Sequence, residues 1–418
     1  MKESFWHKEG ARSVLASVIS ILIGLVAGSL LILAVGLSTK GLGFKSALEG
    51  IRIVFGGLFT TGRTATGALT FGFNPASVGN MLFRATPVIL TGLSVAVAFK
   101  TGLFNIGAPG QYLAGTAATL FIALSIPSGA IPAWLVWVLA LLGGMLAGAL
   151  WGSIPGLLKS LLNINEVLAC IMTNWIAANV VTWVFDVSNL KNVVENTKSG
   201  YIYSTTYGLT QVDGAWTYVK GNGVVTPKMG LDRLFPGSQI NGGILIAILL
   251  AIVVYIVFTR TTFGYQLKAC GSNRYAARYA GINDKRNIVL SMAIAGALAG
   301  AAGSLYYLSG NTEFFWSTYQ QLPAVGFNGI PVALLASNNP IGVIFAGMFM
   351  SMLDICGLQL TNLTAYNEYI TDVIVAVIVY LSAFSLVIKM FIGRFQKREH
   401  ALKGPEPVKQ PAKEAKPE

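Results

Sequence analysis

Long apolar runs, separated by short charged or glycine- and proline-rich segments, dominate the chain. A helix needs roughly 20 mostly apolar residues to cross a bilayer. The pattern predicts about ten spans, the first of which is uncharged and longer than the apolar core of a cleaved secretory signal. The predicted spans are residues 13–39, 85–99, 110–126, 132–157, 167–185, 240–258, 288–308, 326–336, 340–357 and 369–392. The expected fold is therefore an all-α, polytopic membrane helix bundle occupying residues 13–392.

Two of the apolar stretches must contain broken helices. No charged residue lies between Lys100 and Lys159, and this stretch is too long for a single crossing. Proline kinks or ends a helix, and the stretch is interrupted by Pro109, Pro127, Pro132 and Pro155. A turn is expected over Asn105 to Gln111, and Ser337 to Pro340 is expected to separate a half-span at 326–336 from a full span at 340–357.

Four segments outside the spans have a different composition. Residues 40–84 are rich in Gly and Thr and predict an extracytoplasmic segment with an interfacial or partly inserted helix. Residues 186–239 carry mixed charges and predict a folded extracytoplasmic insertion. Residues 260–287 form a basic loop, and residues 393–418, rich in Lys, Pro and Glu, predict a disordered tail.

The composition supports a membrane protein. Of the 418 residues, 54% are hydrophobic and 11% are charged, whereas a soluble domain carries about 25% charged residues. This makes a soluble enzyme or binding module a poor fit. Basic residues are more numerous in the segments that share a side with residues 1–12 and 393–418, so both termini are predicted to be cytoplasmic, in the cell membrane.

Several classes of chemistry are not indicated. The only histidines, His7 and His400, lie near the two ends, and the three cysteines form no C-x-x-C pair. The chain lacks a G-x-x-x-x-G-K-[ST] phosphate loop and any recognisable catalytic set. No catalytic residue, metal site, cofactor or nucleic-acid partner is therefore expected for this chain, which is not predicted to be an enzyme.

Acidic residues near the later spans lie at the predicted span ends. Ion-coupled carriers usually hold ionisable or unwound polar sites deep in the membrane. Interfacial capping is the simpler interpretation of Glu166, Asp354, Glu368 and Asp372, and a role in ion coupling is the alternative.

Small residues recur at intervals of four, which on a helix gives a smooth face for close helix packing. The positions are Gly24 and Gly28; Gly144, Gly148, Gly152 and Gly156; and Gly296 and Gly300.

The helix break after Lys100 combines backbone-breaking residues with two amides. Gly102, Gly107, Pro109 and Gly110 interrupt the helix, and Asn105 and Gln111 lie at the same place. Backbone groups freed in a bilayer must be buried in protein or line an aqueous cavity. The amides are therefore predicted to line a path for a polar, uncharged solute, or alternatively to satisfy the backbone of a structural hairpin. Asn174, within 167–185, is open to the same two interpretations: path lining or interhelical hydrogen bonding.

Three stretches resemble a known family. They are TGLSVAVAFKTGLFNIGAPGQ at 91–111; NEV at 165–167 with MTNWIA at 172–177; and GFNGIPVALL at 326–335 with NNPIG at 338–342. They resemble permeases of ABC importers in the branched-chain amino acid, ribose and nucleoside group, in particular the nucleoside and simple-sugar branch. The resemblance covers roughly residues 85–392 and implies a type II ABC importer permease-like fold. Pro109 and Asn328 depart from the family, which usually has an acid at these positions.

The basic loop carries a fourth match. Asn273 is expected to cap a short helix over Arg274 to Ala280 that Gly281 ends. The loop is similar to the family pattern G-x-x-L-(R/K)-A-x-G-x-N-x-x-A-A-x-x-A-G-I, which implies a coupling helix that docks on an ATPase subunit. The alternative is an ordinary positive-inside loop. The candidate coupling residues are Leu267, Lys268, Gly271, Asn273, Arg274, Ala276, Ala277, Ala280, Gly281 and Ile282.

The resemblance implies the permease subunit of an ATP-driven importer for nucleosides, such as guanosine. ATP and Mg²⁺ would bind a separate ATPase subunit, and the implied partners are a second related permease (in a heterodimer or a homodimer) and an extracytoplasmic substrate-binding lipoprotein. The candidate path residues are Phe104, Asn105, Gln111, Asn174, Trp175, Phe327 and Asn328, whose aromatic members would stack on a base or simply pack. The alternatives are a permease for ribose or another simple sugar and, in another class, a stand-alone secondary transporter or channel.

Overall fold

The fold is described from a computed structural model, for residues 9–39, 43–127, 129–192, 196–200, 207–212, 215–220, 223–316, 321–366 and 368–383. The long helices are α1 (Glu9–Ser38), α3 (Pro75–Lys100), α4 (Ala108–Ser125), α5 (Ala133–Leu162), α6 (Glu166–Val187), α8 (Gly243–Arg260), α11 (Asp284–Tyr307), α13 (Pro340–Leu363) and α14 (Glu368–Ala383). The shorter ones are α2 (Phe44–Gly56), η2 (Gly57–Phe59), α7 (Leu231–Leu234), α9 (Thr262–Ser272), α10 (Arg274–Tyr279) and α12 (Ala324–Leu335).

The predicted all-α bundle is confirmed. Within the described residues, 7 helices are long and apolar enough to cross a membrane: α1, α3, α5, α6, α8, α11 and α13. The other three predicted spans fall on α4, α12 and α14. The end of the last predicted span, residues 384–392, and the predicted tail lie outside the described residues, as do residues 1–8.

Helix α3 is longer than predicted. It begins at Pro75 rather than at residue 85, because Asn74 caps it: the Asn74 side chain accepts a hydrogen bond from the Ser77 N–H at 3.1 Å. Proline suits the first turn, where its missing N–H leaves no bond unmade. The exposed Arg84 falls within the helix and not before it, which is why the apolar run alone gave too late a start.

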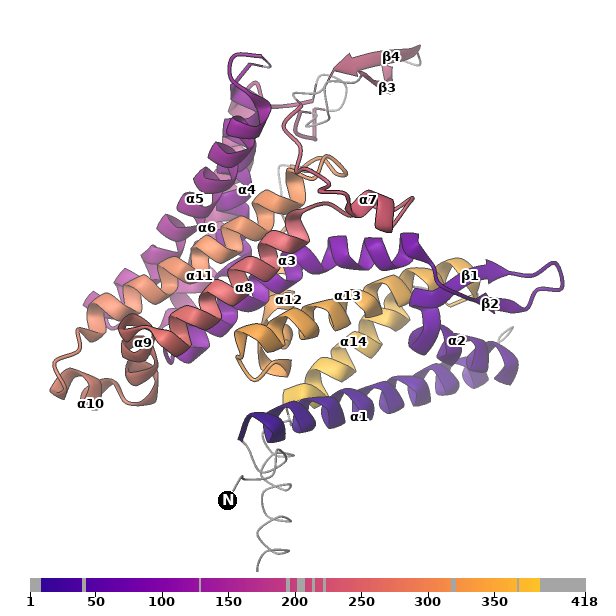
Figure 1. Ribbon diagram of the computed structural model, residues 1–418, viewed down its shortest axis with the longest axis horizontal. Coiled ribbons are helices and arrows are strands. Elements are labelled where there is room, and N and C mark those ends of the chain that lie inside the picture. The colour runs from indigo at the N-terminus through magenta and orange to yellow at the C-terminus, as the bar shows by residue number, and fades with distance from the viewer. Residues whose placement is uncertain are drawn as a thin grey trace, which may run out of the picture.

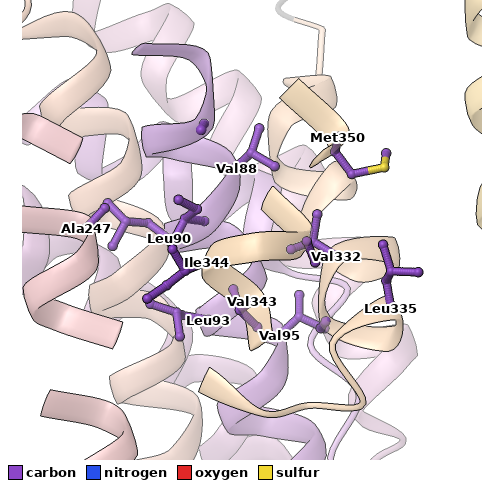
Figure 2. Close-up of a cluster of buried hydrophobic side chains, with 14 of the residues drawn as sticks. Val88, Leu90, Leu93, Val95, Ala247, Val332, Leu335, Val343, Ile344 and Met350 are labelled. Atoms are coloured by element: carbon purple, nitrogen blue, oxygen red, sulfur yellow. The ribbon is translucent and has the colours of Figure 1, made fainter. Parts of the chain in front are cut away.

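The bundle is built around α3 and α11 (Figure 1). Helices α4, α5 and α6 lie on one side, and α12, α13 and α14 lie on the other, with α1 packed along α14. Figure 2 shows the core where α3, α8, α12 and α13 meet. The buried side chains labelled there are Val88, Leu90, Leu93, Val95, Ala247, Val332, Leu335, Val343, Ile344 and Met350.

Glycine allows close contact between α5 and α11. A methyl group added to Gly148 would meet the carbonyl oxygen of Gly296, and one added to Gly296 would meet the carbonyl oxygen of Gly148. A methyl group added to Gly300 would likewise meet the carbonyl oxygen of Gly144. The predicted close packing of these glycines is confirmed, since their backbones touch without intervening side chains.

The segments outside the spans contain short elements. Strands β1 (Thr60–Arg63) and β2 (Leu69–Phe71) form an antiparallel hairpin after α2 and η2. This hairpin was not predicted from the sequence. Strands β3 (Tyr207–Val212) and β4 (Ala215–Lys220) form a second antiparallel hairpin in the predicted insertion. The β3–β4 hairpin lies at the end of the molecule opposite α9 and α10 (Figure 1).

The predicted break between α12 and α13 is confirmed. Ser337 and Asn338 have φ angles of 49° and 57°, in the left-handed region. Asn339 then caps α13, its side chain accepting the N–H of Ile341 at 3.0 Å. Pro340 begins the new helix.

Candidate functional site

The polar segment between α3 and α4 is short. Gly102, at φ 75°, turns the chain after α3, and the Leu103 N–H donates to the Ala98 carbonyl at 3.0 Å. The helix break is confined to residues 101–107. Pro109 and Gly110 lie in the first turn of α4 rather than in the break, which corrects the predicted turn over Asn105 to Gln111, because proline favours a helix start.

Asn105 and Gln111 bind each other across this segment. The Asn105 amide donates to Gln111 Oε1 at 2.9 Å and to Ser94 Oγ at 3.1 Å. The Gln111 amide donates to Asn105 Oδ1 at 3.1 Å. The same Asn105 oxygen also accepts the Gly107 N–H, at 3.1 Å. All three side chains are buried. Ser94 is a partner that sequence analysis missed, since a lone serine in an apolar helix gives little signal.

Asn174 connects α6 to the same segment. Its Oδ1 accepts the Gly110 N–H at 2.9 Å, and its amide donates to the Ile106 carbonyl at 2.9 Å. Asn174 is buried. In this conformation, the geometry therefore corresponds to the structural interpretation of the three amides: they satisfy one another and the interrupted backbone. Their role in lining a path stays a prediction.

The third motif packs on the first. A methyl group added to Gly326 would lie 2.5 Å from the Cα of Pro109, and one added to Gly329 would lie 2.5 Å from the carbonyl carbon of Thr91. Helix α12 thus contacts both α3 and α4 through glycine. The three stretches that carry the family resemblance meet in one place in the fold.

The remaining candidate path residues are dispersed. Phe104 packs against Phe99, with ring centroids 5.3 Å apart, and Phe327 and Asn328 are half-buried on α12. Trp175 is 53% exposed on the outer face of α6. The exposed Asn179, which sequence analysis did not select, donates to the Trp175 carbonyl at 2.8 Å.

The basic loop folds into α9 and α10. The predicted cap of α10 is confirmed: Asn273 Oδ1 accepts the N–H groups of Tyr275 and Ala276, each at 3.0 Å. Gly281, at φ 78°, ends the turn after α10, and the Ile282 N–H donates to the Ala277 carbonyl at 3.0 Å. Among the candidate coupling residues, Leu267 and Ala277 are buried. Lys268, Asn273, Ala276, Ala280 and Gly281 are exposed, and Gly271, Arg274 and Ile282 are half-buried.

Ion pairs hold α10 to the start of α11. Asp284 is buried, and its carboxylate accepts from Arg274 Nε at 2.5 Å and from Arg278 Nη2 at 2.8 Å. The hydrogen bond to Asp284 raises the pKa of Arg278. Sequence analysis missed Asp284, although its place in the first turn of a helix beside two arginines was a usable signal. Tyr279, at 99% exposure, leaves an aromatic side chain in open solution at the end of α10.

Two further observations concern charged groups. Glu166, at the start of α6, forms an ion pair with Lys159 at 3.0 Å, in keeping with a location at a helix end. Across the described part of the chain, no three His, Cys, Asp or Glu side chains lie close enough to hold a metal ion.

Comparison with known proteins supplies the family. Residues 77–383 match the model of the branched-chain amino acid transport system / permease component family. The chain belongs to this permease family. Its apolar helices and this membership together make it a multi-pass membrane protein.

Three relatives of this permease illustrate the match. The guanosine ABC transporter permease protein NupP of Bacillus subtilis is 32% identical over 92% of this chain and 97% of its own length. The nucleoside ABC transporter permease protein NupB of Lactococcus lactis is 36% identical over 87% of this chain and 97% of its own length. The glucose ABC transporter permease protein TsgB13 of Haloferax volcanii is 27% identical over 76% of this chain and 77% of its own length.

The same two bacteria have a second, less similar permease. NupQ of Bacillus subtilis and NupC of Lactococcus lactis are 24% and 25% identical to this chain. They cover 64% and 66% of it.

Proposed function

We propose that the protein is the membrane-spanning permease subunit of an ATP-driven ABC importer for nucleosides, including purine nucleosides such as guanosine. The observation that carries this proposal is the likeness to two permeases named for guanosine and nucleosides, each matched over 97% of its length. The chain supplies the path, while ATP and Mg²⁺ bind a separate ATPase subunit, so no cofactor belongs to this chain.

The coupling loop receives the movement of the ATPase. Helices α9 and α10 project at one end of the bundle (Figure 1), and exposed side chains such as Tyr275 and Tyr279 are available to a partner. Closure of two ATPase lobes would shift the loop and switch the path between outward and inward access. With the coupling loop facing the ATPase, both termini are cytoplasmic.

A second permease completes the path. The pairs NupP and NupQ, and NupB and NupC, support a heterodimer. The exposed Trp175 and Asn179 on α6 fit this arrangement, because an exposed amide within an apolar helix is costly in lipid and is relieved by another protein surface. An extracytoplasmic substrate-binding lipoprotein delivers the substrate.

Uptake by the assembled transporter tests the substrate. Labelled guanosine is supplied to cells that express the chain with its partner subunits, and unlabelled nucleosides, nucleobases, ribose or glucose are added in excess. Competition by nucleosides supports the proposal. Competition by ribose or glucose alone would reject it in favour of a simple-sugar permease. The similarity of this chain to the glucose permease TsgB13 supports that alternative.

Replacement of the coupling helix tests the class of transporter. A Gly/Ser linker in place of 274–280 is expected to abolish ATP-driven uptake. Uptake that persists with the ATPase subunit still bound would reject the coupling role. Uptake into liposomes by the purified chain alone, driven by an ion gradient, would instead identify a secondary transporter.

A further inference from the structure

Helix α9 touches the break between α3 and α4 through the backbone of two glycines, Gly271 and Gly102. A methyl group placed on Gly271 would meet the carbonyl oxygen of Lys100 and would lie 2.9 Å from the Gly102 nitrogen. A methyl group placed on Gly102 would lie 3.0 Å from the Gly271 Cα. The two chain segments are therefore in direct contact, with no side chain between them to absorb a displacement.

This contact is continuous with the buried amide network. Gly102 begins the segment that leads to Asn105, and Asn105 is bonded to Ser94 on α3 and Gln111 on α4. The next link is Asn174 on α6, which donates to the Ile106 carbonyl near the end of this segment and accepts the Gly110 N–H in the first turn of α4. A displacement at Gly102 thus reaches three helices through short hydrogen bonds.

A side-chain bond secures the same turn to α11. The Ser291 hydroxyl donates to Thr101 Oγ1 at 2.8 Å, and Thr101 donates in turn to the Val97 carbonyl at 3.1 Å. Both hydroxyls are buried. The turn at residues 101–102 is therefore held between α9 and α11, the two helices that flank the exposed α10.

We infer that the Gly271–Gly102 contact transmits movement of the coupling loop to the α3–α4 break and so to α6. Gly271 is then a positioning residue that acts inside this chain, and the ATPase acts on the exposed surface of α9 and α10. The inference rests on the proposed function, because it assigns the route by which the same coupling loop reaches the path.

Two glycine variants test the contact in the assembled transporter. Gly271→Ala adds a methyl group at the contact, and Gly43→Ala is its control, because a methyl group at Gly43 meets nothing within 4 Å. Gly102→Ala places a side chain at a positive φ angle, which strains the backbone, and also adds a methyl group against Gly271. Its control is Gly67→Ala, which strains the backbone at φ 81° but meets no atom within 4 Å. Gly271→Ala and Gly102→Ala are expected still to hydrolyse ATP, but the amount of substrate transported per ATP should fall at least about tenfold. The two control variants are expected to transport as much substrate per ATP as the wild type.

The thiol of Cys170 provides a readout that a purely structural defect would not produce. Cys170 is buried and its thiol lies 3.9 Å from Asn105 Oδ1. If the segment moves during turnover, labelling of Cys170 by a small thiol reagent, followed by mass spectrometry, becomes about tenfold faster when ATP is hydrolysed. In Gly271→Ala, the rate with ATP is expected to equal the rate without it.

The outcomes separate this inference from the proposed function. Wild-type labelling that ignores ATP hydrolysis, or a Gly271→Ala transporter with normal transport per ATP, would overturn the inference while nucleoside uptake stands. Wild-type transporter that takes up no nucleoside, yet still shows ATP-dependent labelling, would reject the proposed substrate and leave the contact supported. The labelling of Cys170 is measured in the wild-type transporter, so the inference can be tested even if the glycine variants misfold.

Discussion

Asn174 on α6 holds the backbone of Gly110 on α4, with its Oδ1 accepting the Gly110 N–H at 2.9 Å. The same side chain donates to the Ile106 carbonyl, so one residue satisfies a donor and an acceptor on the two sides of Gly107. Such groups are costly when left unpaired away from water.

Replacing Asn174 by leucine removes both bonds while keeping the number and branching of the side-chain heavy atoms. The unpaired Gly110 N–H and Ile106 carbonyl are expected to lower the free energy of unfolding by about 1–3 kcal/mol. A lower melting temperature in detergent measures this loss. Asn179→Leu is the matched control on the same helix, since Asn179 is exposed and its amide donates to the Trp175 carbonyl one turn away. Equal effects of the two variants would contradict the role of Asn174.

Gly148→Ala tests the contact between α5 and α11. The added methyl group would meet the Gly296 carbonyl oxygen, and separating the helices is expected to cost about 1–3 kcal/mol of stability. Thermal melting again provides the measurement. Gly143→Ala, also on α5, is the control, because its methyl group would meet only the end of the flexible Ile122 side chain. A stable Gly148→Ala protein with unchanged transport would argue against rigid contact there.

Asp284→Asn tests the attachment of α10 to α11. It removes the charge that pairs with Arg274 and Arg278, so α10 is expected to move without its neighbour and ATP-driven transport to fall by about tenfold. Co-purification of the ATPase subunit shows whether docking survives. Lys285→Gln changes the neighbouring exposed residue and is expected to behave as the wild type. The attachment would be rejected if Asp284→Asn transported normally.

Tyr366→Phe tests how α1 is held to the turn before α14. The buried Tyr366 hydroxyl donates to the Ile32 carbonyl at 3.2 Å, and its removal is expected to cost about 0.5–1.5 kcal/mol. Tyr369→Phe is the control, because that ring is 67% exposed. Melting temperatures of the two variants are compared, and a larger loss in Tyr369→Phe would contradict the assignment.

The sequence predicted the elements whose signals are local. Apolar length gave the spans, and Asn273, Gly281 and the Ser337–Pro340 break gave the ends of helices, because caps and left-handed turns depend on a few adjacent residues. The predicted start of α3 is too late because the prediction ends the extracytoplasmic segment at 40–84 with the charged Arg84. The β1–β2 hairpin was missed because a strand of three or four residues has too little alternation to be recognised.

Pairing between distant segments was not accessible to the same reasoning. The amides of Asn105, Gln111 and Asn174 were identified as an unusual group, but whether they face a path or one another depends on where α6 lies. The ion pairs of Asp284 and the contact between Gly271 and Gly102 depend likewise on the folding back of the coupling loop. Motifs located the region, and only three-dimensional packing gave the partners.

The glycine contact between α5 and α11 limits how this protein can work. Because the carbonyl oxygens of Gly148 and Gly296 face the opposite backbone directly, the two helices cannot slide past each other without collision. They are expected to travel as one rigid body throughout the transport cycle. The hinges must then lie at other interfaces, and labels that report distance changes belong on pairs outside α5 and α11.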